Sequence, residues 1–339
     1  MKAIKFFAIS AMAAAMITSC SNEDELSQSN YPSDNIIRIT AGVNNAKTRA
    51  DGTAGTPLEK PLSLTVVNKN TTDPVLAAKY TYVNKVFTKD DNGVWKCSEA
   101  QPLLWQNATQ AVDIVAFAPA VNKETFKDVY NEKFQQFTYS IAANQSTSSD
   151  NNDLLYNYTP DFVPGGTNLD KDGKLSIQMN HAFCMIDINV TLGTEFNVSG
   201  VPTASPITEV TLGGTKITAD VNATSTSNIV TASETAAAKD ITATKGDFDT
   251  PADNDKEKSC ISHFSCITVP QTVAANTFKV SLKTAGKLYE WTSKDAVTLE
   301  SGYRYTLELS MGNDVVLLKG EKITASPWGN GEGGSLETD

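Results

Sequence analysis

The sequence has very few of the side chains on which enzymes and metal-binding proteins most often rely. Histidine occurs only twice in 339 residues, as His181 and His263. Both lie in strand-like apolar stretches, where a histidine is more often a hydrogen-bonded core residue than a catalytic base. The sequence also contains no Gly-x-Ser-x-Gly elbow and no phosphate-binding loop. We therefore expect neither an enzyme nor a cofactor-dependent protein.

Long hydrophobic runs and positive charge are also scarce. The apolar run Phe6–Ile17 is shorter than the ~20 residues that a membrane-spanning helix needs. Any membrane attachment is therefore expected to depend on a lipid. Lys and Arg number 28 against 39 Asp and Glu, which gives a net charge of −11 at pH 7. Such an acidic chain argues against nucleic acid as a partner and against a basic membrane-binding patch.

Cysteine is sparse as well, so a disulfide framework is not expected. One of the five cysteines, Cys20, has a separate role described below, and the other four allow three pairings, which the sequence leaves open. These four are Cys97, Cys184, Cys260 and Cys266. Cys184 lies in an apolar strand-like run and is predicted to be a small buried hydrophobe. A strand would hold Cys260 and Cys266 roughly 20 Å apart, so we predict neither a disulfide between them nor a metal site around His263.

What the sequence does have is an export signal at its start. Lys2 and Lys5 precede the apolar run, and Ile17-Thr18-Ser19 leads into Cys20. A charged start, a short apolar middle and small residues before a cysteine are typical of a bacterial lipoprotein signal. We predict that residues 1–19 are removed, that Cys20 carries the lipid, and that residues 20–34 form a polar tether. Loss of the two lysines changes the net charge from −11 to −13.

A short strand and a protease site follow the tether. Ile37, Ile39, Ala41 and Val43 alternate along the segment 35–43, which predicts a half-buried strand. In the polar loop that follows, Thr48-Arg49-Ala50 offers a cut between Arg49 and Ala50. The position of this arginine, between one strand and the first block of strands, favours deliberate processing. We predict that the segment 35–49 is removable.

The rest of the chain predicts an all-β protein. Short alternating runs rich in Thr and Val are separated by turn signals such as Asn92-Gly93. This pattern is typical of β-sandwiches, and the length suggests two domains, over residues 35–173 and 174–339. One helical turn is expected near 123–129, and the low-complexity stretch 219–259 is expected to be a flexible loop or an irregular hairpin. The expected strands are 35–43, 62–66, 79–87, 94–97, 111–117, 175–179, 182–192, 208–212, 260–269, 278–282, 288–291, 304–311 and 315–318.

Beyond these patterns, the chain resembles the fimbrillin family, the subunits of type V pili and their relatives, over nearly its whole length. The order and spacing of several segments together carry the resemblance. These segments are the signal ending at Cys20, Asn22–Glu25, Thr48–Ala50, Val112–Pro119, Asp153–Tyr156, Asn180–Ile188, Val269–Gln271, Lys287–Trp291, Leu299–Leu307 and the ending from Ile323 to Trp328.

The resemblance implies two transthyretin-like Greek-key β-sandwich domains in tandem and a structural role. It also implies export to the outer membrane as a lipoprotein and removal of the N-terminal strand by an arginine-specific protease. The C-terminal segment of the next fimbrial subunit would then fill the vacated groove and build a fimbria that supports adhesion. The candidate donor residues are Val315, Val316, Leu317, Leu318, Ile323 and Trp328.

Elementary energetics supports that scheme. Loss of four alternating apolar side chains would expose pockets and unpaired backbone groups, and burying those side chains is worth roughly 6–8 kcal/mol. Strand addition satisfies such an edge, and head-to-tail insertion builds filaments rather than closed dimers. In the candidate donor, Ile323 and Trp328 are an odd number of residues apart, so a regular strand would place them on opposite faces.

Two other functions are compatible with the sequence. A non-polymerising surface lipoprotein of the same fold could bind glycans or host proteins, with an exposed tryptophan stacking on a sugar. The chain could also be the anchor or the tip of a fimbria. An anchor should keep its lipid and lack the cut at Arg49, and a tip should lack a donor segment such as Val315–Trp328, so both features argue against these roles.

Overall fold

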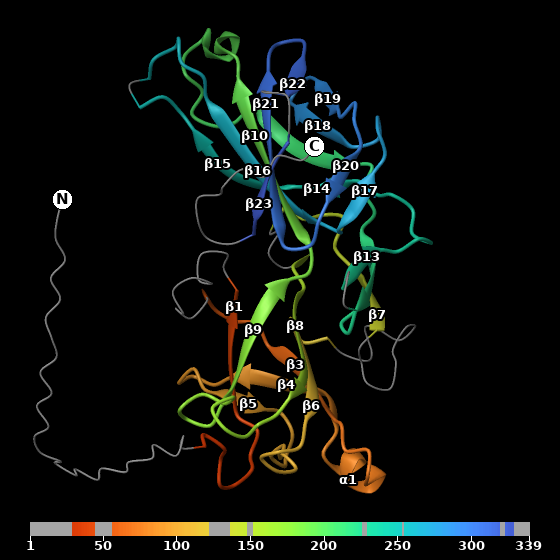
Figure 1. Ribbon diagram of the computed structural model, residues 1–339. Helices are drawn as coiled ribbons and strands as arrows, with labels where there is room; N and C mark the ends of the chain where they lie inside the picture. Colours follow the sequence, from red (N-terminus) through yellow and green to blue (C-terminus); the bar gives the residue numbers. More distant parts are fainter. Residues whose placement is uncertain are drawn as a thin grey trace, which may run out of the picture.

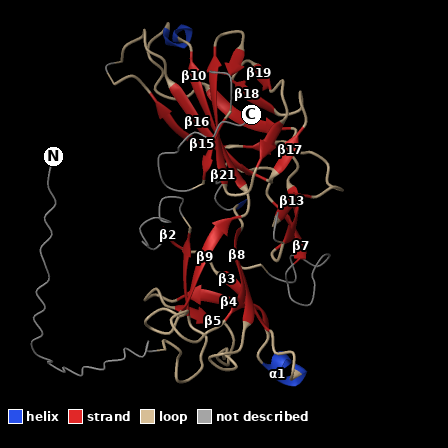
Figure 2. Cartoon of the chain, viewed as in Figure 1, coloured by secondary structure: helices blue, strands red, loops and turns tan. Residues whose placement is uncertain are grey.

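The computed structural model describes residues 29–44, 56–121, 136–147, 152–225, 229–252, 254–318 and 323–328. These residues form a nearly all-β protein with two lobes (Figures 1 and 2). No helix in the described ranges is long and apolar enough to cross a membrane. The four cysteines in the described ranges all carry free thiols.

The N-terminal lobe is built on one eight-stranded sheet with the order β2-β1-β9-β8-β6-β3-β4-β5. Its strands are β1 (Ile39–Val43), β2 (Thr56–Pro57), β3 (Leu62–Asn68), β4 (Tyr82–Lys89), β5 (Trp95–Cys97), β6 (Val112–Ala118), β8 (Leu155–Phe162) and β9 (Leu175–His181). All neighbours are antiparallel except β1 and β9, which run parallel. The first strand of the chain therefore lies beside the last strand of its sheet.

A short helix, α1 (Pro74–Lys79), replaces the start of the strand expected over 79–87. The carboxylate of Asp73 accepts hydrogen bonds from the backbone N–H groups of Val75 and Leu76, both at 3.0 Å. Pro74 follows at the first helical position, where its missing N–H costs nothing. The helix start signal Asp73-Pro74 was therefore present in the sequence, and strand β4 begins only at Tyr82.

The C-terminal lobe packs a six-stranded sheet against a four-stranded sheet. The larger sheet has the path β15-β16-β10-β21-β22, with β23 also paired to β21, and the smaller one has the order β14-β11-β18-β19. Side chains from both sheets share one hydrophobic core. The strands are β10 (Cys184–Leu192), β11 (Ile207–Gly213), β14 (Ile241–Thr242), β15 (Thr244–Asp249), β16 (Ile261–Thr268), β18 (Lys279–Thr284), β19 (Leu288–Thr292), β21 (Tyr303–Met311), β22 (Val316–Leu318) and β23 (Thr324–Pro327).

Two small sheets complete this lobe, and none of their strands was expected from the sequence. One joins β7 (Gln136–Ser140), β12 (Thr218–Asn222) and β13 (Val230–Ala232); the other joins β17 (Gln271–Val273) and β20 (Val297–Leu299). A 3₁₀ turn covers Thr194–Asn197. The helical turn expected near 123–129 lies outside the described residues.

The stretch 219–259, expected to be a flexible loop or an irregular hairpin, instead contains most of β12 and all of β13, β14 and β15. Its buried residues include Ala219, Val221 and Ala223 in one alternating row and Ile241 and Ala243 in another. Alanine carries much of this alternation, and alanine is a weak strand signal. The surrounding Thr, Ser and Asp residues therefore gave the stretch a low-complexity appearance that hid the pairing.

The chain also crosses between the lobes in ways that the expected boundary at 173/174 does not describe. Strand β9, which begins at Leu175, belongs to the N-terminal sheet, whereas β7 pairs with β12 of the C-terminal lobe. Strand β6 is buried on both faces: Ile114 and Ala116 join the N-terminal core, and Val115 and Phe117 join the C-terminal core. The rings of Phe117 and Phe137 meet edge to face at 4.9 Å. One strand thus contributes to both cores.

We predict that Phe117→Ala destabilises the protein by about 3–5 kcal/mol, because it removes a fully buried ring from the shared strand and leaves a cavity. Phe117 is 1% exposed. Urea unfolding measures the change, and the control is Val75→Ala, which truncates a side chain that is 79% exposed and should shift stability by about 0.5 kcal/mol or less. Equal effects of the two substitutions would contradict the shared-core arrangement.

Candidate functional site

The candidate site begins with the N-terminal strand β1, which is hydrogen-bonded along both of its edges. On one edge it pairs in parallel with β9, from Ile39 opposite Leu175 to Val43 opposite Met179. The Leu175 N–H donates to the Arg38 carbonyl at 2.8 Å, just before the ladder begins. On the other edge β1 pairs with the two residues of β2. The strand is therefore an inner strand of the sheet, although only two residues cover its outer edge.

The residues just before β1 are held by a different part of the lobe. The Ile37 N–H donates to the Leu103 carbonyl at 2.8 Å, and the Trp105 N–H donates to the Asn35 carbonyl at 2.8 Å. The structure thus divides the expected strand 35–43 into a bridge at residues 35–37 and the strand Ile39–Val43. Both parts belong to the segment that precedes the expected cut.

The side chains that were expected to alternate into the core are buried to different degrees. Ile37 and Ile39 are 4% and 3% exposed, and both lie in the core with Leu175, Ile177 and Met179 of β9. Ala41 and Val43 are only partly buried against the same core. Two fully buried isoleucines are worth roughly 3–6 kcal/mol, which is less than the roughly 6–8 kcal/mol expected for four side chains. The N-terminal half of the segment therefore contributes most of the apolar burial that stabilises its docking in the sheet.

The expected lipid site, Cys20, and the expected cleavage site between Arg49 and Ala50 lie outside the described residues. Asn44 and Thr56 are the described residues on either side of the gap, so the expected cut falls between β1 and β2. After such a cut, β2 would stay with the main body and β1 would keep only non-covalent contacts with it.

The candidate donor segment lies on the C-terminal sheet of its own chain. β22 and β23 both pair antiparallel with β21, so the described parts of the segment lie along one edge of that sheet. Val316 is 6% exposed, whereas Val315 and Leu317 are 50% and 59% exposed. The apolar run at 315–318 therefore buries only one face among the residues whose side chains are described, not both as its composition suggested. The side chain of Leu318 is outside the described part of the structure.

The last described residues of this segment are half-buried. Ile323 and Trp328 both pack against the C-terminal core, and Ala325 between them is 4% exposed. The two larger side chains therefore flank the short strand β23 rather than lying within it. Their odd spacing causes no conflict, because only Thr324–Pro327 has to be regular.

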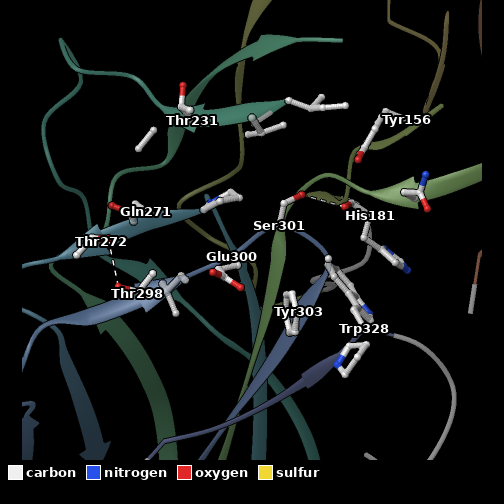
Figure 3. A pocket seen from close by; sticks show the side chains of 18 of the residues that line it. Tyr156, His181, Thr231, Gln271, Thr272, Thr298, Glu300, Ser301, Tyr303 and Trp328 are labelled. Carbon is white, nitrogen blue, oxygen red and sulfur yellow. Dashed lines mark hydrogen bonds between the residues drawn. The ribbon is translucent and has the colours of Figure 1, made fainter. Parts of the chain in front are cut away.

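A cleft of about 1010 Å³ lies where the two lobes meet, and it is lined by the ends of both segments. Asn44 follows β1, Asn180 and His181 end β9, and Trp328 follows β23. Figure 3 shows Ser301 and the ring of Trp328 beside His181, with Glu300 and Tyr303 nearby. The other lining residues are Tyr156, Lys216, Ile229, Val230, Thr231, Ala232, Pro270, Gln271, Thr272, Thr298, Leu299, Gly302 and Pro327.

His181 is held by a carboxylate and an aromatic ring. Its Nδ1 lies 2.8 Å from Oδ2 of Asp153, whose side chain is 8% exposed. The ring stacks on Trp328 with a centroid distance of 3.9 Å and an interplanar angle of 11°. Burial, together with the nearby charge of Asp153, raises the pKa of Tyr139 to about 12. The sequence suggested a core histidine here, and the structure shows a half-buried one at the rim of a cleft.

Other polar clusters in the described ranges are unlike catalytic or metal centres. No group of three or more His, Cys, Asp and Glu side chains is placed to hold a metal ion among the described residues. Burial strongly raises the pKa of the Cys184 thiol, with Cys266 as a smaller cause. Both thiols are therefore poor nucleophiles.

Comparisons with known proteins place these features in context. A family model described as fimbrillin-like matches residues 48–328. The structure is similar to a candidate cell adhesion protein from Bacteroides ovatus, with a TM-score of 0.57, 14% identity, and coverage of 85% of this chain and 96% of that chain. A candidate cell adhesion protein from Bacteroides uniformis gives a TM-score of 0.56, 16% identity, and coverage of 88% and 99%.

A third solved structure is the tip fimbrial protein Mfa3 from Porphyromonas gingivalis, with a C-terminal truncation. It has a TM-score of 0.48 and 11% identity, and the match covers 86% of this chain and 99% of that chain. No curated protein matches the chain in sequence. The two Bacteroides structures show that the fold described above recurs in other proteins.

We predict that Ile39→Ala lowers the free energy of unfolding by roughly 2–5 kcal/mol, because Ile39 is one of the two side chains that seat β1 in the core. The matched control is Thr40→Ala on the next residue, whose side chain is half-buried and points to the opposite face. Its effect should be no more than about 1 kcal/mol. Urea unfolding of both variants tests the prediction, and a larger effect of Thr40→Ala would contradict the described seating of β1.

Proposed function

The chain belongs to the fimbrillin-like family, and from that premise we propose that it is a pilin subunit that polymerises by strand exchange. The family and the all-β fold indicate a fimbrial or adhesin-like subunit. In the proposal the chain is exported as a lipoprotein through Cys20 and anchored in the outer membrane by its lipid. An arginine-specific protease then cuts between Arg49 and Ala50, and the exposed groove accepts the C-terminal segment of another subunit.

The single observation that carries this proposal is the position of β1. The strand lies beside β9, which is more than 130 residues away in sequence, and its covalent connection to β2 passes through residues 45–55. A cut at Arg49 would sever that connection. The segment would then be held by its hydrogen bonds, by the burial of Ile37 and Ile39, and by the partial burial of Ala41 and Val43.

The vacated place would suit an incoming strand. Loss of β1 leaves the backbone groups of β9 unpaired and opens the apolar core that contains Ile177. Such an edge is a template for another chain, because an added strand satisfies its hydrogen bonds and fills its pockets with alternate side chains. The insertion joins two different surfaces, so it repeats into a filament.

The C-terminal segment is a suitable donor because it is weakly committed to its own domain. It lies at a sheet edge, and Val315 and Leu317 are half or more exposed. Release of the segment would give up the burial of Val316 and Ala325 and the partial burial of Ile323 and Trp328, but none from the two exposed side chains. The gain on insertion would come from those same side chains, which have no buried place in the monomer.

The position of the arginines fits a specific protease. The sequence contains only three arginines, Arg38, Arg49 and Arg304. Arg38 pairs with Asp34 at 2.6 Å, and Arg304 lies inside β21 with its Nε 3.3 Å from Asp187. Regular pairing and ion pairs hinder the local unfolding that proteolysis requires. Arg49 is therefore the proposed site of cleavage.

The finer fold assignment belongs to the same proposal. Two packed sheets around a single core support a transthyretin-like sandwich for the C-terminal lobe. For the N-terminal lobe the support is the eight-stranded sheet around a core of its own. The strand β6, which enters both cores, distinguishes this pair from two independent domains on a flexible linker.

A second candidate function is a non-polymerising surface adhesin that binds glycans in the cleft between the lobes. The observation that favours it is the combination of Tyr303, Trp328 and the exposed carboxylate of Glu300 along one cleft (Figure 3). Aromatic rings stack on sugars, and carboxylates accept hydrogen bonds from hydroxyl groups. One face of Trp328 is already covered by His181, which makes this function the weaker of the two. An anchor or tip role within a fimbria is a further alternative.

We predict that an arginine-specific protease converts the folded wild-type protein into polymers, whereas Arg49→Ala stays monomeric with its fold intact. The matched control is Arg38→Ala, which removes an arginine from the departing segment and leaves the cut in place, so it should still polymerise. Native gels and electron microscopy measure assembly, and mass spectrometry identifies the cut.

Two outcomes would overturn the polymerisation proposal. Filaments from uncut Arg49→Ala protein would show that cleavage is not the trigger. A stable monomer after complete cutting and loss of the N-terminal segment would favour the adhesin instead. In that case a glycan array with the cut monomer, compared with Glu300→Ala, would test the cleft directly.

A further inference from the structure

We propose that the end of β9 couples the departure of β1 to the release of the C-terminal strand, with His181 as the residue that carries the coupling. The inference rests on the strand-exchange function proposed above and concerns its regulation. A subunit whose donor strand came free before its acceptor groove was open would expose two adhesive edges at the wrong time. The contacts at the end of β9 provide a way to link the two events.

On one side, the end of β9 is held by the segment that would be removed. The Asn44 N–H donates to the Met179 carbonyl at 2.7 Å, and the Asn44 side-chain amide donates to Oδ1 of Asn180 at 2.9 Å. Asn44 is the last described residue after β1. Removal of the segment would therefore take away both hydrogen bonds and the parallel ladder beside them.

On the other side, the next residue of β9 holds the C-terminal segment. The ring of His181 stacks on Trp328 at 3.9 Å, and the Trp328 N–H donates to the Gly302 carbonyl at 2.7 Å. The hydroxyl of Ser301 donates to the Ala182 carbonyl at 2.8 Å and lies 3.2 Å from the His181 carbonyl, and the Gly302 N–H donates to the Phe183 carbonyl at 2.8 Å. The Trp328 ring is therefore held by His181, and its backbone is held by a turn that is anchored on residues 181–183.

This stack matters because β23 has few other anchors. Of its four residues only Ala325 is buried, and Pro327 has no backbone N–H to donate. The strand pairs with β21 alone among the described strands. Trp328 and Ile323, which are half-buried and flank the strand, are the large side chains that pack it on the core. Loss of the stack would therefore loosen the end of β23.

The orientation of His181 depends on β9 remaining in place. Nδ1 of the imidazole lies 2.8 Å from Oδ2 of Asp153, while Oδ1 of the same carboxylate is buried without a hydrogen-bond partner in the described structure. A carboxylate with one unsatisfied oxygen tolerates little movement away from its remaining partner. A shift of β9 would thus weaken the Asp153 contact and the Trp328 stack together.

The pairing of β9 with β8 limits how strongly the departure of β1 can affect the C-terminal strand. Leu155 pairs with His181 and Tyr156 pairs with Asn180, and these pairs remain when β1 leaves. The end of β9 would therefore fray rather than detach. We expect a graded loosening of the C-terminal strand, not an all-or-none release.

The test is amide hydrogen exchange of residues 323–328 in four samples: wild type and His181→Gln, each before cutting and after cutting at Arg49 and separation of the released N-terminal segment, in dilute solution. Glutamine can keep a hydrogen bond to Asp153 but provides no ring to stack. Cutting should speed exchange in the wild type by about three- to tenfold, the range for loss of one aromatic pair. His181→Gln should show most of that increase before cutting and little further change after it.

Two further variants keep the result interpretable. Trp328→Ala removes the other ring of the stack near the end of the described chain, and should match His181→Gln. His263→Gln is the matched control, because His263 also pairs with an aspartate, Asp249 at 3.0 Å, but lies on β16 and is not part of this cleft. It should leave exchange at 323–328 unchanged.

The outcomes separate this proposal from the polymerisation proposal. Equal acceleration by cutting in the wild type and in His181→Gln would overturn the role of His181, even if filaments form normally. Unchanged exchange after the N-terminal segment has been removed would overturn the coupling itself. If the variants behave as expected but the cut protein never polymerises, the coupling stands and strand exchange does not.

Discussion

The parallel pairing of β1 with β9 is the contact on which the rest of this structure depends. It closes the N-terminal sheet with residues from the very start of the described chain, and it covers the strand that leads directly into the C-terminal lobe. Because the pairing is non-local, it costs chain entropy to form. In the proposed scheme another strand of suitable pattern would take the place of β1 after cleavage, and the sheet would be complete only while that place is occupied.

The two lobes are less independent than the word domain suggests. Strand β6 faces one core with Ile114 and the other with Phe117, and the chain enters the C-terminal lobe at β7 before returning for β8 and β9. Both faces of this one strand are buried, so it ties the two cores together. The cleft beside it is lined by residues of both lobes, which suits either contact between subunits or a binding surface.

Much of this architecture could be predicted from local pattern, and the rest depends on contacts that local pattern does not contain. Alternation identified strand β1 and most of the long strands, although the structure places Ile37 just before β1 rather than in it. It missed β7, β8 and β12–β15; in the last group, alanine in β12 and β13, the two-residue length of β14 and the polar residues of β15 weaken the apolar pattern. It also overlooked the Asp73-Pro74 helix start. The pairing of β1 with β9 and the stack of His181 on Trp328 join residues more than 130 positions apart, and nothing in the neighbouring sequence indicates them. Cys20, Arg49 and Ala50 rest on sequence alone.

The direct connection of β9 to β10 has a mechanical consequence. Only Ala182 and Phe183, both completely buried, separate the two strands, and Figure 1 shows them running from one lobe into the next. β10 in turn runs parallel to β21, the strand that carries the chain's end. In a filament built as proposed, tension would enter along β9 and leave through β21. The hydrogen bonds on this line would be loaded in shear, all at once, rather than opened one by one. Such a fibre would resist flow at the cell surface while its subunits stayed folded.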